Sequence, residues 1–168
     1  MGLFSETLNT MEDLYLDQLQ DLYDAEQRLT KALPQMAEAA KAPELKRAFE
    51  THLRETEGQI KRLERCFELL GKTPKAKTCD AMKGLVSEGQ TVVNASGDDD
   101  VRDAALIAAA QRVEHYEMAG YGCARTFAMR VGQENAAELL QETLDEEEKT
   151  DRLLTEIAEA SVNIKASR

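Results

Sequence analysis

Tryptophan is absent from this chain, and glycine, proline and aromatic residues are scarce. Its 168 residues include 9 Gly and 3 Pro, and aromatic side chains make up only 5%. The β-branched residues are too scattered to predict strands. Most of the remaining residues are Leu, Ala, Glu, Lys, Gln and Met, which favour helices. The sequence therefore predicts an all-α protein, and its length suits a single domain over residues 1–168.

The chain also lacks a basic patch, paired cysteine motifs and long apolar runs. Its net charge is −11, so direct binding of nucleic acid is disfavoured. Cys66, Cys79 and Cys123 show no CxxC spacing, which indicates free thiols in a reducing compartment. No run of about 18 apolar residues exists, and the N-terminus lacks the blocks of a signal peptide. We therefore expect no membrane span and a cytoplasmic location.

Hydrophobic periodicity divides the chain into four long helices and one short helix. The predicted ranges are residues 5–40, 44–70, 81–93, 99–130 and 134–160. Ser5 is the expected N-cap of the first helix. Short breaks at residues 41–43 and 131–133 predict two antiparallel helix pairs, because so few residues can only reverse the chain. The segment 72–97 is long enough to cross from one end of the bundle to the other.

Each long helix carries polar residues in the middle of its apolar stripe. Glu114 and Glu117, for example, continue the stripe on which Ile107, Ala110 and Tyr121 lie. A buried carboxylate without a partner costs several kcal/mol, or it becomes protonated instead. Such a group of residues therefore needs a partner of opposite charge. The candidate residues are Glu26, His52, Glu55, Glu114, Glu117, Glu147 and Asp151.

These residues are predicted to lie at one height in the bundle. Glu26 and Glu55 are 15 and 14 positions from residue 41, and Glu117 and Glu147 are both 15 positions from residue 132. A helix rises by about 1.5 Å per residue, so equal counts from a turn give equal heights. Four-helix bundles hold two iron or two manganese ions with such carboxylates and histidines. The layer therefore predicts a metal centre, with two Fe ions as the first choice and Mn or Zn as alternatives.

Each residue also has a structural interpretation when it is taken alone. Glu26 fits a side chain that lines a pocket, His52 fits a hydrogen-bonded core residue, and Asp151 fits the edge of the bundle. The joint occurrence favours metal, because several carboxylates repel one another in a low dielectric. His115 points about 100° away from Glu114 on an ideal helix, so we expect it on the flank of the site.

Several segments of the chain resemble the YciE/YciF-type family of ferritin-like bacterial stress proteins. The resemblance covers nearly the whole chain and rests on residues 22–26 (LYDAE), 43–46 (PELK), 52–57, 105–117 and 140–147. It implies a ferritin-like four-helix bundle, a homodimer and a bacterial cytoplasmic setting linked to stress. The usual ferritin-like pattern is Glu-x-x-His, whereas here His52 precedes Glu55, and Asp151 rather than histidine follows Glu147.

Two functions of different classes follow from the sequence. The first is a dinuclear metal protein that reacts with oxygen or peroxide. In it Glu55 and Glu114 bridge the ions, and Glu26, Glu147, His52 and Asp151 are terminal ligands, with Glu117 as a further ligand. The second is a non-catalytic dimeric interaction protein whose buried polar layer only fixes the helix register. Iron storage in a shell is a weaker third possibility. The sequence leaves open whether the chain is an enzyme.

Overall fold

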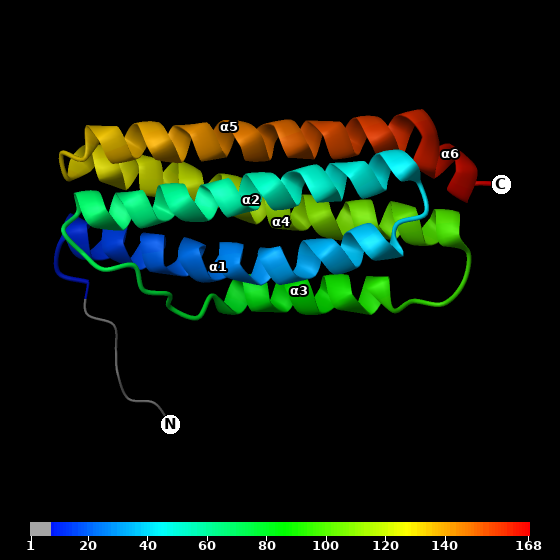
Figure 1. Ribbon diagram of the computed structural model, residues 1–168, viewed down its shortest axis with the longest axis horizontal. Helices are drawn as coiled ribbons and strands as arrows, with labels where there is room; N and C mark the ends of the chain where they lie inside the picture. The colour runs from blue at the N-terminus through cyan, green and yellow to red at the C-terminus, as the bar shows by residue number, and fades with distance from the viewer. Residues whose placement is uncertain (1–7) are drawn as a thin grey trace, which may run out of the picture.

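Four long helices run side by side along the long axis of the computed structural model, which describes residues 8–168 (Figure 1). The elements are α1 (Met11–Ala39), α2 (Pro43–Leu69), α3 (Asp80–Val93), α4 (Asp99–Arg130), α5 (Glu134–Ile157), the π-helix η1 (Ala158–Val162) and α6 (Asn163–Ala166). No strand occurs within residues 8–168. The predicted all-α bundle is confirmed.

The helices form two antiparallel pairs that pack face to face. One pair is α1 with α2 and the other is α4 with α5, while α1 also packs on α4 and α2 on α5. The short helix α3 lies along α1 and α4, so the segment between α2 and α4 carries the chain from one end of the bundle to the other (Figure 1). Each long helix therefore has one stripe that faces the bundle interior.

The ends of the bundle differ from the predicted boundaries. Ser5, the predicted N-cap, lies outside the described residues, and α1 begins at Met11 after the N-cap Thr10. Thr10 Oγ1 accepts a hydrogen bond from Asp13 N at 3.1 Å, and Asp13 Oδ2 accepts one from Thr10 N at 2.9 Å. This capping box satisfies two free N–H groups and so fixes the start of the helix. At the other end, helical structure continues through a π-turn to Ala166.

The core consists of two hydrophobic clusters separated by a polar layer. One cluster includes Leu29, Phe49, Leu106 and Leu154, and the other includes Leu19, Leu63, Phe67 and Leu140. Between them along the helices lie buried polar residues, namely Glu26, His52, Thr56, Gln59, Glu114, Glu117, Thr143, Glu147 and Thr150. The two clusters hold the four helices together on both sides of the layer, so the fold itself positions the site.

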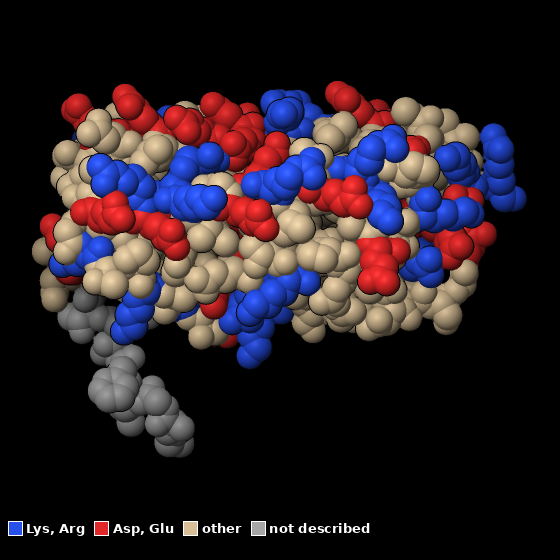
Figure 2. Space-filling model, viewed as in Figure 1, with Lys and Arg blue, Asp and Glu red and all other residues tan. Residues whose placement is uncertain are grey.

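The surface carries charges of both signs. On the face shown in Figure 2, Lys and Arg side chains alternate with Asp and Glu over α2 and α5. Among the helices of the described residues, none combines the length and the apolar character that a membrane span requires.

Asp103 on α4 closes the turn between α1 and α2. Its side chain accepts hydrogen bonds from Lys41 N at 2.9 Å and from Ala42 N at 2.7 Å. Ala42 is the N-cap residue of α2 and supplies no side-chain cap of its own. Asp103 is only 1% exposed, so it replaces water as the partner of these N–H groups.

We expect Asp103→Ala to lower the free energy of unfolding by about 2 kcal/mol, because it leaves two N–H donors of the turn without partners. Chemical denaturation followed by circular dichroism measures this loss. Asp100→Ala is the matched control, since Asp100 reaches only the exposed Lys41 side chain at 3.4 Å. The control should cost less than about 0.5 kcal/mol. Equal losses in the two variants would contradict the capping role of Asp103.

Candidate metal centre

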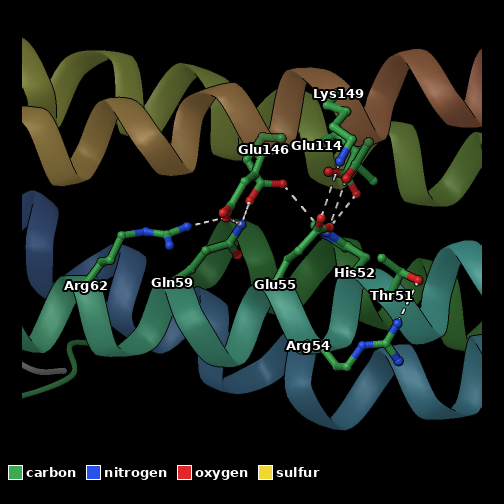
Figure 3. Close-up of polar contacts among 11 residues, drawn as sticks. Thr51, His52, Arg54, Glu55, Gln59, Arg62, Glu114, Glu146 and Lys149 are labelled. Carbon is green, nitrogen blue, oxygen red and sulfur yellow. Dashed lines mark hydrogen bonds and ion pairs between the residues drawn. The ribbon is translucent and has the colours of Figure 1, made fainter.

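Four buried side chains from three helices converge in the polar layer. His52 on α2, Glu114 and Glu117 on α4, and Glu147 on α5 each offer a ligand atom, and these atoms all lie within 4.8 Å of one another. Glu114 and Glu117 share one face because they are one turn apart on α4. Figure 3 shows His52 projecting from α2 toward α5, with Glu114 reaching it from α4. We call these four residues the central cluster.

The two ring nitrogens of His52 have different surroundings. Nε2 lies 3.4 Å from Glu114 Oε1 and 3.6 Å from Glu147 Oε2, so it faces the central cluster. Nδ1 lies 3.4 Å from Thr150 Oγ1 and 3.6 Å from Glu55 Oε2. A partner on one ring nitrogen orients the ring and leaves the other nitrogen available to a metal ion. Thr150 and Glu55 thus hold His52 with Nε2 toward the cluster.

Glu26 on α1 extends the central cluster. Its Oε1 accepts a short hydrogen bond from the Tyr121 hydroxyl, while its Oε2 has no hydrogen-bond partner. The side chain is fully buried beside Glu117 and Glu147. At this level α1 and α4 approach closely, since a Cβ on Gly120 would lie 2.8 Å from Leu22 Cδ2. The close approach brings Tyr121 within reach of Glu26.

Most polar atoms of the layer lack hydrogen-bond partners, although nearly all buried polar atoms in folded proteins have one. The atoms without a partner are Glu26 Oε2, His52 Nε2, Thr56 Oγ1, Gln59 Oε1, Glu114 Oε2, both carboxylate oxygens of Glu117, and Glu147 Oε2. Six of these atoms belong to Glu26 and the central cluster, and all six are carboxylate oxygens or an imidazole nitrogen. This donor set is typical of Fe, Mn and Zn sites. The residues present therefore fit divalent metal ions.

Protons supply the positive charge when no metal is bound. Burial, followed by the negative charge of Glu147, raises the pKa of Glu26 to about 8. Burial likewise raises the pKa of Glu114 and of Glu117 well above the usual range. Burial alone lowers the pKa of His52, but the carboxylates around it, with Glu114 first, raise it to about 10. A metal ion that enters the cluster must therefore displace protons.

Three of the seven predicted ligands are not among the four residues of the central cluster, and two of these three, Glu55 and Asp151, lie at its edge. Glu55 is partly exposed and meets His52 on the Nδ1 side. Asp151 Oδ1 accepts a hydrogen bond from Gln111 Nε2 at 3.1 Å and lies 3.4 Å from His115 Nε2. The structure thus brings together His52, Glu114, Glu117 and Glu147, places Glu26 beside them, and leaves Glu55 and Asp151 at the edge.

Sequence reasoning does not identify Thr150, which contacts His52. Its position three residues after Glu147 on the same helix face is the signal that points to it. Gln59, a polar residue on the α2 stripe, donates a short hydrogen bond to Glu147 Oε1 and another to Glu146 Oε2 at 3.1 Å. These contacts orient the carboxylate of Glu147 from the α2 side of the site.

Known proteins share this fold and much of this sequence. The family described as a domain of unknown function, DUF892, matches residues 10–167. Protein YciF of Escherichia coli (strain K12) is 46% identical over 160 residues, which cover 95% of this chain and 96% of that protein. The crystal structure of the E. coli stress protein YciF superposes with a TM-score of 0.89 and covers 93% of this chain and 99% of that one.

A second solved structure, YcfI from Rhodopseudomonas palustris, is 41% identical, with a TM-score of 0.87, and covers 91% of this chain and 98% of its own. A protein from Xanthomonas campestris pv. campestris is 25% identical, with a TM-score of 0.73, over 95% of this chain and 98% of its own. These similarities span nearly the whole chain in each case. The chain therefore belongs to the DUF892 family of YciF-type proteins.

Proposed function

We propose that this chain is a ferritin-like stress protein of the bacterial cytoplasm that binds two divalent metal ions, iron or manganese, and reacts with oxygen or peroxide. The observation that carries the proposal is the set of buried carboxylate and imidazole atoms without hydrogen-bond partners, all directed at one volume. Such atoms are costly in a metal-free core and become favourable when they bind cations. The relationship to the E. coli stress protein supports the stress-associated role.

Charge balance supports two ions rather than one. Glu26, Glu114, Glu117 and Glu147 are all buried and together carry four negative charges when ionised. With neutral His52 as a ligand, two divalent cations bring four positive charges and cancel them. A single divalent cation would leave two negative charges in a low dielectric, where they are unfavourable.

The residues of the chain have distinct roles at the proposed centre. His52 Nε2 and the four buried carboxylates would hold the ions, and iron or manganese would supply redox chemistry when bound. Tyr121 fixes one oxygen of Glu26 and leaves the other free. The two hydrophobic clusters exclude water on both sides of the layer, which strengthens every electrostatic interaction inside it.

Anaerobic titration with Fe(II), followed by metal analysis, tests the proposal. We expect about two ions per chain, as in other bundles with such carboxylate sites. The double variant Glu26→Ala and Glu114→Ala should lose this binding. Fewer than one ion per chain in the wild-type protein, unchanged in the double variant, would contradict the proposal. It would favour the alternative of a non-catalytic protein whose polar layer is structural.

The homodimer implied by the family resemblance stays a prediction. Sedimentation equilibrium with and without bound metal measures the oligomeric state directly. The same experiment shows whether metal loading and association are coupled.

We expect Tyr121→Phe to weaken metal binding by about 10- to 100-fold, because groups that orient a ligand contribute at this level. Without the hydroxyl, the carboxylate of Glu26 loses the hydrogen bond that lowers its pKa, so protons compete more strongly with metal. Titration calorimetry with Mn(II) measures the change. Tyr23→Phe is the matched control, since its hydroxyl donates to Glu64 at 2.9 Å, away from the site. Equal Mn(II) affinities of Tyr121→Phe and Tyr23→Phe would show that Tyr121 does not orient Glu26 for metal binding.

A further inference from the structure

The central cluster is closed to solvent. The side chains of His52 and Glu114 are each 2% exposed, and that of Glu147 is 0% exposed. Glu26 and Glu117 are equally inaccessible. A hydrated cation therefore cannot reach the ligands unless some side chain at the surface moves.

Glu55 connects the cluster with the surface. It lies on α2, three residues after His52, and its side chain is 23% exposed. Its Oε2 is 3.6 Å from His52 Nδ1, while its Oε1 is 4.0 Å from Lys149 Nζ on α5. The Lys149 side chain is itself 72% exposed. Figure 3 shows Lys149 extending from α5 toward Glu55 across the seam between the two helices.

Stronger contacts hold this seam together on one side of Glu55. On one side of Glu55, Gln59 donates to both Glu146 and Glu147, and Arg62 donates a short hydrogen bond to Glu146. The seam is thus tied by several charge-assisted hydrogen bonds at that point. In contrast, the pair of Glu55 and Lys149 is long and solvent-exposed, and such pairs contribute little to stability. Among these contacts between α2 and α5, that of Glu55 with Lys149 is the weakest.

We propose that Glu55 and Lys149 form the gate through which divalent cations reach the central cluster. This inference rests on the proposed metal-binding function. Lys149 covers the carboxylate and repels cations until it swings into solvent. Glu55 then captures the cation and passes it inward to Glu114 and Glu147, whose free oxygens lie on the other side of His52. Glu55 is a transit residue in this scheme and not a permanent ligand.

Stopped-flow measurement of Co(II) uptake, combined with equilibrium dialysis, tests the gate. We expect Glu55→Gln to slow uptake by about tenfold or more, since a charged side chain at a mouth raises cation on-rates by such factors. The number of Co(II) ions bound at equilibrium should not change. Lys149→Gln should accelerate uptake. Glu57→Gln and Lys61→Gln are the matched controls, because both residues are exposed on α2 and touch no member of the cluster.

The outcomes separate the gate from the metal site itself. If Glu55→Gln took up Co(II) at the wild-type rate, the proposed gating role of Glu55 would be wrong. Loss of an ion at equilibrium in this variant would also overturn it, because Glu55 would then be a permanent ligand. If Lys149→Gln took up Co(II) at the wild-type rate, Lys149 would have no part in the gate. If the wild-type chain binds no Co(II), Fe(II) or Mn(II), the proposed function fails first.

Discussion

Between pH 5 and pH 8 the metal-free protein is expected to lose stability, on the order of 3 kcal/mol. The loss originates in the polar layer, where the pKa of Glu26 is raised by burial from 4.5 to about 8. Burial also raises the pKa of Glu114 and of Glu117. Neighbouring carboxylates raise the pKa of His52 to about 10.

Stability falls with rising pH because the folded state binds more protons than the unfolded state. A group with a raised pKa binds its proton more tightly in the folded state than in the unfolded state. Its contribution to stability is complete below the unfolded pKa and is lost as the pH rises through the folded pKa. For Glu26 this window runs from about 4.5 to about 8, and for His52 from about 6.5 to about 10. Both groups therefore make the folded state less stable as the pH rises.

Urea unfolding at pH 5, 6, 7 and 8 in the presence of a chelator measures this dependence. Glu26→Gln should make the dependence shallower, because the amide does not titrate while Glu114, Glu117 and His52 still do. Glu44→Gln is the control, since hydrogen bonds from its backbone and from Ser161 lower the pKa of Glu44, which is ionised throughout this range. Metal displaces the protons, so the metal-induced rise in Tm should be larger at pH 8 than at pH 5. Constant or rising stability of the metal-free protein would contradict the prediction.

The bundle and the height of its polar layer could be predicted from the sequence. Apolar spacing locates the helices, and the two short turns fix the register of each antiparallel pair. Gly132 shows why the second turn is sharp, because its φ of 74° belongs to the left-handed region that favours glycine. Since helix rise is constant, counting from such turns places Glu26, Glu117 and Glu147 at one level.

The contacts that refine the site connect distant parts of the chain, so spacing along a helix does not reveal them. Tyr121 and Glu26 are 95 residues apart, and Asp103 caps a turn 61 residues before it at Ala42. Helical phase explains the positions of the two outer residues. Glu55 is rotated about 60° from His52 on α2, toward the seam with α5, and Asp151 turns toward Gln111 on α4.

Replacing Glu117 by leucine is expected to stabilise the metal-free protein by about 1 to 4 kcal/mol, as apolar replacements of buried ionisable groups often do. Glu117 is 0% exposed, and neither of its carboxylate oxygens has a hydrogen-bond partner. Leucine has a similar volume and packs against the hydrophobic clusters on either side. The same change removes a proposed ligand, so stabilisation by metal should fall sharply.

Urea unfolding with chelator and with saturating Mn(II) separates the two effects of Glu117→Leu. In the wild-type protein, Mn(II) at 100 times its Kd should add about 2.7 kcal/mol per site. Glu117→Gln is the matched control, because it also removes the proposed carboxylate ligand but keeps a buried polar group without partners, and so should not stabilise the metal-free form. If Glu117→Leu kept the full stabilisation by Mn(II), Glu117 would not be a ligand. If it destabilised the metal-free protein, the carboxylate would support the fold without metal, and the polar layer would need a structural explanation.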